Sequence, residues 1–338
     1  MFKVRMITQE DANKIFNLKM ALLAVEDAYL EKANGDGEDW PMIFHDFETG
    51  KSDLDVKSGN LRQKGIYGLK VVSWNVANKE KNLPDLTCTT LVFDEKTGAP
   101  IAMINAGSIT GARTGAAAAI GAKYLARKNS KNMMLVGCGA QSPYVLAETL
   151  MTLPSIEEVM IVNPFMPESA EKSLTSIIDK VDSLLKESGI KRTATIGSSV
   201  DIKGTTGKSD VILTVTPSKD AMIKKEWVKA GTHFSCIGSD MVGKQEIESA
   251  IFKNALVIGD SKIQNISVGE CEIPFKEGII TEIDGEIGQV INGSVKGRTS
   301  EEQITIFDST GIALQDLSSA DIIIKKCIED GLGTLVEI

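Results

Sequence analysis

The sequence predicts an α/β protein with a Rossmann-type, doubly wound parallel sheet, joined to an α+β part. From about residue 132 onward, short apolar runs alternate with helical stretches, which is the pattern of parallel β-α-β units. Before that point, β-branched segments follow one another without helices between them, as in a separate sheet. At 338 residues the chain has the length of about two domains.

The first third is expected to hold a strand, a long helix and then several strands. A strand is predicted over residues 2–7, and apolar residues at helical spacing predict one helix over residues 9–33. Strand-like runs follow at residues 68–74, 87–93 and 100–105. The Ala-rich stretch at residues 114–126 predicts the next helix.

The rest of the chain alternates strands and helices. Helices are expected near residues 141–153 and 168–188, and a last one at 320–328. Short, continuously apolar runs, typical of buried parallel strands, lie at 132–136, 159–162, 211–215, 234–237, 256–258 and 304–307.

Charge and residue usage exclude several classes of protein. Lys and Arg number 37 and Asp and Glu 46, a net charge of −9, which argues against a nucleic-acid-binding surface. No run reaches the ~18 apolar residues of a membrane span, and the first 20 residues lack a signal-peptide core. Five scattered cysteines and two histidines fit a reduced, cytoplasmic protein with neither a disulfide framework nor a metal site.

The strongest local signal is a glycine turn between a buried strand and a helix. Gly137 and Gly139 stand in Val-Gly-Cys-Gly-Ala-Gln, directly after the apolar run at residues 132–136. In dinucleotide-binding folds the first glycine permits the turn and the second lets the backbone approach the pyrophosphate. Ser142 stands in place of the third glycine. The pattern predicts dinucleotide binding, with a purely structural turn as the alternative.

Asn163 occupies the position that usually separates NAD from NADP. NAD enzymes offer Asp or Glu there to hold the ribose hydroxyls. Asn163 has no charge to repel a 2′-phosphate, and no Arg follows to attract one, although Lys172 lies downstream. NAD or NADP is therefore expected, and the choice stays open.

Three charged residues outside the glycine turn are candidates for chemistry. Lys70 lies inside the apolar run 68–72, where burial of a lysine is costly; the alternative is an outward-facing lysine on an alternating strand. Arg113 opens the Ala-rich helix and is suited to clamp a carboxylate or phosphate, or else to make a surface ion pair. Asp240 follows an apolar strand, where acids face the ligand crevice; the alternative is a helix cap.

Four segments together resemble the ornithine cyclodeaminase/mu-crystallin family, in family order and over nearly the whole chain. They span residues 108–117, 136–141, 238–246 and 305–316. The resemblance implies a homodimer with a central NAD(P)-binding Rossmann domain, residues 117–315. It implies a substrate-binding and dimerisation domain built from residues 1–116 and 316–338.

The resemblance also implies site residues. Lys70 would contact the substrate near its reacting carbon, Arg113 would bind the substrate carboxylate, and Asp240 would carry the proton or bind the amine. The cofactor would be held by Thr114, Gly137, Gly139, Ala140, Gln141, Asn163, Thr216, Ser309 and Gly311.

Two departures from the family pattern bear on the substrate. An arginine is common after a proline in the early sheet, but here Pro41 leads to His45. Ornithine cyclodeaminase has a glutamate about thirteen residues before the Lys70 position, where this chain has Lys57; the alternative is that Asp55, two residues earlier, supplies the negative charge. A cation there disfavours a diamino acid and favours a substrate with a second acidic group. Lys57 and His45 are therefore further substrate-binding candidates.

Three functions compete. The first is an NAD(P)-dependent oxidoreductase that acts on the Cα–N bond of a small amino or imino acid, as a dehydrogenase or a ketimine reductase. The second is an ornithine cyclodeaminase-type ammonia lyase with bound NAD and no net redox change. The third is an NADP-dependent ligand-binding protein of mu-crystallin type, against which the presence of Lys70, Arg113 and Asp240 together argues.

Overall fold

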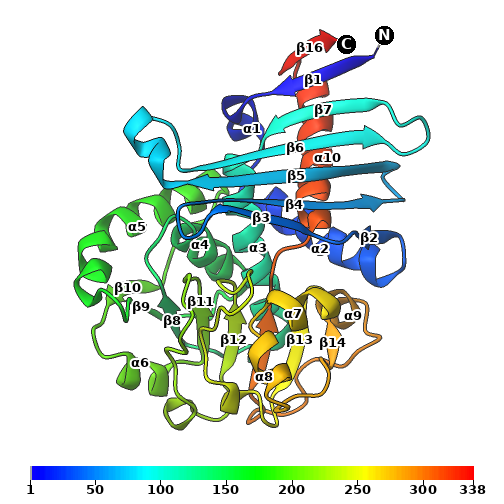
Figure 1. Cartoon of the computed structure of the whole chain (residues 1–338). Helices are drawn as coiled ribbons and strands as arrows, with labels where there is room; N and C mark the ends of the chain where they lie inside the picture. The colour runs from blue at the N-terminus through cyan, green and yellow to red at the C-terminus, as the bar shows by residue number, and fades with distance from the viewer. Residues whose placement is uncertain (1) are drawn as a thin grey trace. The chain divides into compact units, whose positions relative to one another are not determined.

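The computed structural model describes residues 2–338 and divides into two compact units (Figure 1). Unit 1 comprises Met1–Arg113 and Ile312–Ile338, and unit 2 comprises Thr114–Gly311. Among the described residues, no helix is long and apolar enough to cross a membrane.

Unit 1 is built on an eight-stranded sheet in which only the β1–β7 pair is parallel. The strand order is β16-β1-β7-β6-β5-β4-β2, and β3 also pairs with β4. The strands are β1 (Lys3–Ile7), β2 (Gly37–Asp39), β3 (Ile43–Glu48), β4 (Ser52–Leu61), β5 (Ile66–Asn75), β6 (Leu86–Asp94), β7 (Pro100–Asn105) and β16 (Thr334–Glu337).

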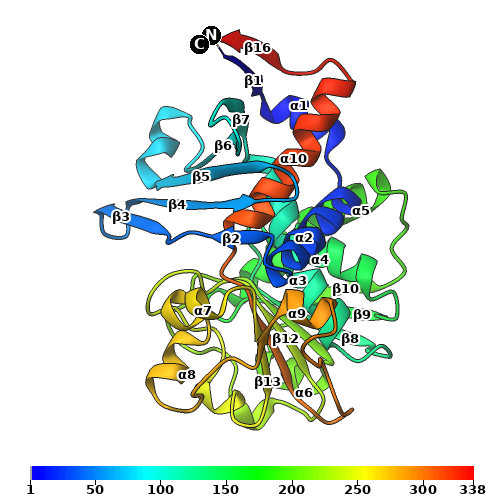
Figure 2. The ribbon, with the colours of Figure 1, turned by 90° about the vertical axis from the view of Figure 1, so that its right-hand side faces the viewer.

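A long C-terminal helix covers one face of this sheet. Helix α10 (Ala313–Glu329) packs against α2 (Leu18–Ala33) and crosses β4, β5 and β6, as Figure 2 shows. Gly68 on β5 makes this close packing possible, because a Cβ there would lie 2.8 Å from Leu317 Cδ2 and 2.2 Å from the carbonyl oxygen of Leu91. This contact brings the N-terminal part of α10, at Leu317, against β5. The remaining helical segments of unit 1 are α1 (Gln9–Ile15) and the 3₁₀ turn η1 (Val76–Lys81).

The single helix predicted over residues 9–33 is wrong, because the chain breaks between α1 and α2. Phe16 is extended, and the Asn17 side chain accepts a hydrogen bond from the Met20 backbone N–H as the N-cap of α2. The sequence signal for this break is Asn17, a short polar residue within an otherwise helical pattern of apolar residues.

Two helices begin earlier than the sequence predicts. Helix α3 runs from Gly107 to Leu125 rather than from residue 114, so that Arg113 lies in its second turn instead of opening it. Helix α10 begins at Ala313 rather than at residue 320. In both cases Gly, Ser or Thr near the start suggested a loop, and burial of the segment overrides that preference.

Unit 2 contains an eight-stranded, fully parallel sheet of order β10-β9-β8-β11-β12-β15-β13-β14. Chain order reverses at β8, which lies between β9 and β11, so the predicted doubly wound Rossmann-type fold is confirmed. The strands are β8 (Asn132–Val136), β9 (Glu158–Val162), β10 (Thr195–Ser198), β11 (Val211–Thr214), β12 (His233–Cys236), β13 (Leu256–Gly259), β14 (Gly285–Glu286) and β15 (Thr305–Asp308).

The sheet of unit 2 has a core of continuously apolar strands, and helices connect them. This core includes Met134, Val136, Ile212, Phe234 and Ile306, all fully buried. The helical segments besides α3 are α4 (Ser142–Thr152), α5 (Pro167–Glu187), α6 (Ile202–Lys208), η2 (Lys225–Trp227), η3 (Ser249–Ile251), α7 (Lys262–Val268), α8 (Glu272–Lys276) and α9 (Ile287–Ile291).

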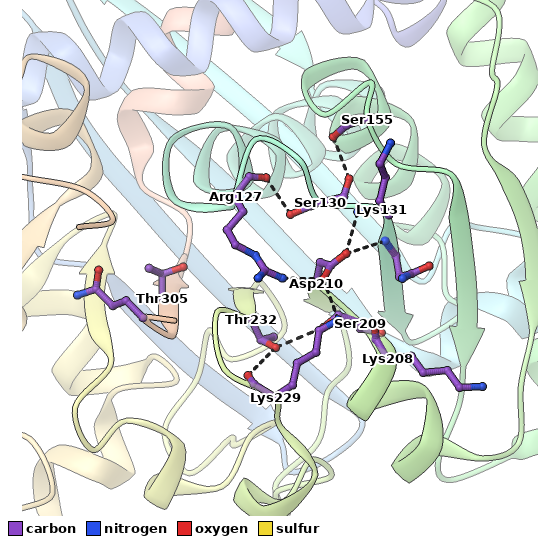
Figure 3. Close-up of polar contacts among 12 residues, drawn as sticks. Arg127, Ser130, Lys131, Ser155, Lys208, Ser209, Asp210, Lys229, Thr232 and Thr305 are labelled. Atoms are coloured by element: carbon purple, nitrogen blue, oxygen red, sulfur yellow. Dashed lines mark hydrogen bonds and ion pairs between the residues drawn. The ribbon is translucent and has the colours of Figure 1, made fainter. Parts of the chain in front are cut away.

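Asp210 ties together the amino ends of three strands of unit 2, at the edge opposite the predicted cofactor site (Figure 3). Its carboxylate accepts hydrogen bonds from the backbone N–H groups of Lys131 and Asn132 at the start of β8 and pairs with Arg127 and Lys229 at 2.7 and 2.8 Å. Its carbonyl accepts from the His233 N–H at the start of β12. Although burial raises the pKa of the Asp210 carboxyl, Lys229 and the backbone donors hold it below its usual value.

Candidate active site

The glycine turn after β8 has the backbone geometry that a dinucleotide requires. Gly137 adopts φ +115°, a conformation that favours glycine, and a Cβ there would lie 2.8 Å from the Val215 carbonyl oxygen. Gly139 and Ala140 are exposed at the tip of the turn, and a Cβ at Gly139 would meet no atom within 4 Å among the described residues. The backbone at Gly139 is therefore open to a ligand.

Helix α4 begins directly at this turn and offers donors for phosphate. It starts at Ser142 with Pro143 in its first turn, and no side chain among the described residues caps it at the Gln141 N-cap. The buried Ser142 hydroxyl donates to the Gly137 carbonyl at 3.2 Å and so braces the turn. An uncapped helix start, a braced turn and an open Gly139 fit the pyrophosphate of a nicotinamide dinucleotide.

The other predicted cofactor residues of unit 2 lie at several places along its chain. Asn163 follows β9, and its amide donates to the Ser169 hydroxyl at 2.7 Å, while its side-chain oxygen accepts from two backbone N–H groups. Thr216 follows β11, and Thr114 is buried on α3. Ser309 and Gly311 follow β15, where the Ser309 hydroxyl and the Gly311 N–H each donate to Asp260 at 2.8 Å. Except for Thr114, all of these lie at the carboxyl ends of strands, the edge where open α/β sheets bind ligands.

Unit 1 contains a buried charged cluster, formed by Lys57, Lys70, Arg113 and Asp316. Lys70 stands in the middle of β5, is 1% exposed, and donates from Nζ to Asp316 Oδ1 at 2.8 Å. Arg113 approaches the same oxygen with Nε at 3.3 Å, and its Nη1 donates to Gln315 at 3.3 Å. Asp316 and Gln315 belong to the first turn of α10, which the glycine contact at β5 places there.

Lys57 adds a third positive charge to the buried charged cluster. In the β4–β5 register it lies directly opposite Lys70, and Thr90 lies opposite Lys70 on β6, so the three side chains share the face of the sheet that α10 covers. Lys57 and Thr90 are both buried. Lys57 therefore lies beside Lys70 within the buried charged cluster.

The electrostatics of the cluster favour an additional anion. Burial, then the charge of Arg113, lowers the pKa of Lys70 to about 8, against the opposing effect of Asp316. Burial by itself raises the pKa of Asp316, but the charges of Lys70 and Arg113 hold it below its usual value. Asp316 Oδ2 is buried and, within residues 2–338, has no hydrogen-bond partner. Lys70 and Arg113 both contact the same oxygen of Asp316, and this pair of cations at one carboxylate oxygen suits an additional ligand carboxylate.

Within the described chain, Asp240 does not cap a helix, which was the alternative role considered for it. It follows β12 in a loop, the next helical segment is η3, and its side chain is 46% exposed. Lys244 Nζ donates to Asp240 Oδ1 at 2.5 Å. Asp240 thus lies at the carboxyl edge of the sheet of unit 2, within reach of solvent and next to a cation.

His45 lies on β3, where every residue is exposed. It stands opposite Leu54 rather than Lys57, and its ring meets the ring of Phe47 edge-on at 4.8 Å. No contact among the described residues brings His45 to Lys70, whereas the sheet register does bring Lys57 there.

Sequence reasoning missed the residues that organise these sites. Asp316 lies in the segment that resembles the family, but its ion pair joins residues 246 positions apart. The Gln315 amide donates to the buried Tyr29 hydroxyl at 2.6 Å and thereby links α10 to α2. Burial of polar side chains within an otherwise apolar helix would have been the signal, but it is visible only in the fold.

Comparison with known proteins identifies one family and several relatives that match this chain over nearly its whole length. The model of the ornithine cyclodeaminase/mu-crystallin family matches residues 3–331. The chain is 34% identical to alanine dehydrogenase of Archaeoglobus fulgidus, over 98% of this chain and 97% of the relative. It is 28% identical to iminosuccinate reductase of Paracoccus denitrificans, over 98% and 99% of the two chains.

Solved structures agree over the whole length. An archaeal alanine dehydrogenase dimer with bound NAD superimposes with a TM-score of 0.87 at 33% identity and full coverage of both chains. The Δ¹-pyrroline-2-carboxylate reductase of Thermococcus litoralis, in complex with NADH and L-proline, gives a TM-score of 0.87 at 29% identity and covers 98% of this chain and 100% of that chain.

Proposed function

Because the chain belongs to the ornithine cyclodeaminase/mu-crystallin family, we propose that it is an NAD(H)-dependent oxidoreductase that interconverts a small α-imino acid and its amino acid. The reaction takes place at the Cα–N bond. Whole-length similarity to an alanine dehydrogenase, an iminosuccinate reductase and a pyrroline-2-carboxylate reductase supports this reaction class.

The observation that carries the proposal is that Lys70 and Arg113, both buried, converge on the same oxygen of Asp316. Two buried cations at one carboxylate oxygen are suited to a substrate that brings a carboxylate. Arg113 presents a planar guanidinium, which pairs with carboxylates in bidentate geometry. We infer that Arg113 binds the α-carboxylate and that Lys70 lies close to the reacting carbon.

The reaction also moves a proton to or from the substrate nitrogen. This step requires a group whose pKa lies near neutrality or a group that contacts solvent. Lys70, with a pKa of about 8, exchanges a proton readily between pH 7 and 9. Asp240 is half-exposed and paired with Lys244, so it is suited to pass a proton between solvent and the substrate nitrogen. We assign the proton transfer to these two residues, with Asp240 as the carrier.

The cofactor would be held by unit 2. The backbone at Gly139 and the start of α4 would bind the pyrophosphate, and the loops that contain Asn163, Thr216, Ser309 and Gly311 would flank the rest of the molecule. When bound, the nicotinamide supplies or accepts the hydride. The solved relatives contain NAD or NADH, which supports NAD(H) over NADP(H).

Lys57 supports a substrate with a second acidic group. Ornithine cyclodeaminase activity requires a site for a distal amine, and a buried lysine opposite Lys70 disfavours one. We therefore favour an imino acid with a second carboxylate, such as iminosuccinate, over ornithine.

A substrate panel tests the proposal. Purified protein is mixed with NADH and, in turn, with pyruvate plus ammonia, oxaloacetate plus ammonia, and Δ¹-pyrroline-2-carboxylate, and absorbance at 340 nm is followed. We expect NADH consumption with at least one of them. Ammonia release from ornithine without any net change in absorbance would instead identify a cyclodeaminase, and NADH binding without turnover of any compound would identify a binding protein.

We also propose a homodimer. Strand β3 of unit 1 exposes Ile43 and Phe47, each 62% exposed, on an eight-stranded sheet, and such apolar exposure is typical of an interface. The archaeal alanine dehydrogenase is a dimer. Light scattering on the purified protein should give twice the chain mass of 36.3 kDa, and a monomer would refute this assignment.

A further inference from the structure

One buried carboxylate joins two loops at the carboxyl edge of the sheet of unit 2. Glu246 is fully buried. Its Oε1 accepts hydrogen bonds from the backbone N–H of Thr216 at 2.7 Å and from the Thr216 hydroxyl at 2.8 Å. Its Oε2 accepts from the Thr214 hydroxyl at 2.6 Å and from the Gly238 N–H at 2.9 Å. The loop after β11 and the loop after β12 are thus held by the same side chain.

The backbones of these loops lie too close together to adjust independently. A Cβ at Gly238 would lie 2.1 Å from the Thr216 carbonyl oxygen and 2.5 Å from the Thr216 nitrogen. A Cβ at Gly137 would lie 2.8 Å from the Val215 carbonyl oxygen. The dinucleotide turn after β8 therefore rests on the loop after β11, which rests on the loop after β12. Any shift of the Glu246 carboxylate would change the spacing of all three.

A second buried acid holds Glu246 itself in place. The Glu270 carboxylate accepts from the Glu246 backbone N–H at 2.9 Å, from the Ile247 N–H at 2.8 Å and from the Ser239 hydroxyl at 2.5 Å. Burial, followed by the negative charge of Glu246, raises the pKa of Glu270 well above its usual value. Hydrogen bonds therefore hold both ends of Glu246: its backbone N–H donates to Glu270, and its carboxylate accepts from Thr214, Thr216 and Gly238.

We propose that Glu246 is a positioning residue for the cofactor, which sets the spacing of the loops after β8, β11 and β12 through its hydrogen bonds to Thr214, Thr216 and Gly238. The inference rests on the proposed function, in that these loops are taken to border a dinucleotide. It also gives Thr216 a specific part. Because the Thr216 hydroxyl and N–H are bonded to Glu246, this residue contributes to the cofactor site through the position of its backbone.

The test uses Glu246→Gln, which keeps the shape of the side chain but turns an NH₂ group toward donors that need an acceptor. We expect the Kd for NADH, measured by fluorescence titration of the folded protein, to rise about tenfold or more, the effect of losing one or more charge-assisted hydrogen bonds. The KM for NADH should rise by a similar factor, while kcat changes less.

A matched control separates positioning from general stability. Asp210→Asn alters a buried acid that ties the opposite, amino edge of the same sheet (Figure 3). It should lower Tm by several degrees and leave the Kd for NADH within about twofold of wild type. If Glu246→Gln does not fold, Thr214→Val decides: it removes a single donor to Glu246 and should raise the Kd in the same direction by a smaller factor.

The outcomes are distinct. A folded Glu246→Gln protein with the wild-type Kd for NADH, or an unchanged Kd in Thr214→Val if the first variant cannot be obtained, overturns the inference and leaves the proposed function intact. An increase in Kd for Asp210→Asn equal to that for Glu246→Gln also overturns it, because general loosening would then explain both. A wild-type protein that binds no NADH overturns the proposed function and this inference together.

Discussion

Replacement of Asp316 by Asn isolates the electrostatic role of the buried charged cluster. The substitution keeps the size of the side chain and removes the one carboxylate that Lys70 and Arg113 share. Lys70 Nζ lies 2.8 Å from Asp316 Oδ1, so its ammonium form loses its closest counter-charge while Arg113 and Lys57 remain. The neutral form of Lys70 is thereby favoured, and its pKa must fall.

The size of the shift follows from the geometry. With Asp316 in place the pKa of Lys70 is about 8. An opposite charge at such a distance changes a pKa by about 1–3 units, so Lys70 in the variant should titrate at roughly pH 5–7. At pH 7.5 the charged fraction of Lys70 would then drop from about three quarters to a few per cent, for a shift of about 2 units. Reductive turnover that needs the charged lysine should fall by roughly 25-fold at this pH.

The pH profile of kcat/KM is the assay that distinguishes this effect from a general loss of activity. In the direction of imine reduction, the alkaline limb of wild type should lie near pH 8, and in Asp316→Asn it should move toward acid by about 1–3 units. The Kd for NADH and the circular dichroism spectrum serve as controls and should not change. If the limb stays at the same pH in both proteins, Asp316 does not set the pKa of Lys70 and the reasoning fails.

Four further substitutions test the cofactor site, the substrate carboxylate site, the proton carrier and the ion pairs of Asp210. Gly139→Val should fold, because the Cβ position is open, and should lose NADH affinity; calorimetry that finds full affinity would show that the cofactor site is misplaced. Arg113→Ala should weaken binding of a carboxylate substrate or competitive inhibitor by about 10- to 100-fold, from the loss of about 1.5–3 kcal/mol, and leave the Kd for NADH unchanged; equal inhibitor affinity in both proteins would contradict its role. Asp240→Asn should keep fold and cofactor and slow turnover by about 10²–10⁴-fold in stopped-flow experiments; a rate within about threefold of wild type would transfer the proton-carrier role to Lys70. The pKa of Asp210 is lowered in the folded state, so its stabilising effect is present above the ordinary carboxyl pKa and is lost as the pH falls below that value. The Tm difference between wild type and Asp210→Asn should therefore shrink on acidification. A Tm difference that stays constant with pH would contradict the assignment.

The parts of the fold that sequence predicts well are those whose signals are local. The run at residues 132–136, the turn at Gly137 and the start of α4 follow one another within about ten residues, and each has a stereochemical reason that the sequence displays. The break at Asn17 and the early start of α10 were missed because the decisive contacts come from capping and from burial against the sheet, which local periodicity does not register.

The chemistry of the site is less accessible from sequence, because its pairs are distant in the chain. Lys70 stood out as a lysine in an apolar run, but whether it faced inward depended on the register of three strands and on Gly68 admitting α10. Lys57 could be compared with the family position but not placed opposite Lys70 without the sheet. Glu246 lies within a segment that resembles the family, yet Thr214 and Thr216, two of the partners that give it a role, lie 32 and 30 positions away.

Deuterium labelling shows whether the protein transfers a hydride between nicotinamide and the Cα of an imino acid. The protein is incubated with NADH carrying deuterium at both C4 positions and with the imine that the substrate panel identifies, and the amino acid formed is examined by mass spectrometry and NMR. We expect one deuterium per molecule, at Cα, with one NADH oxidised for each amino acid formed. A product that carries no deuterium at Cα, or that forms without oxidation of NADH, would contradict it.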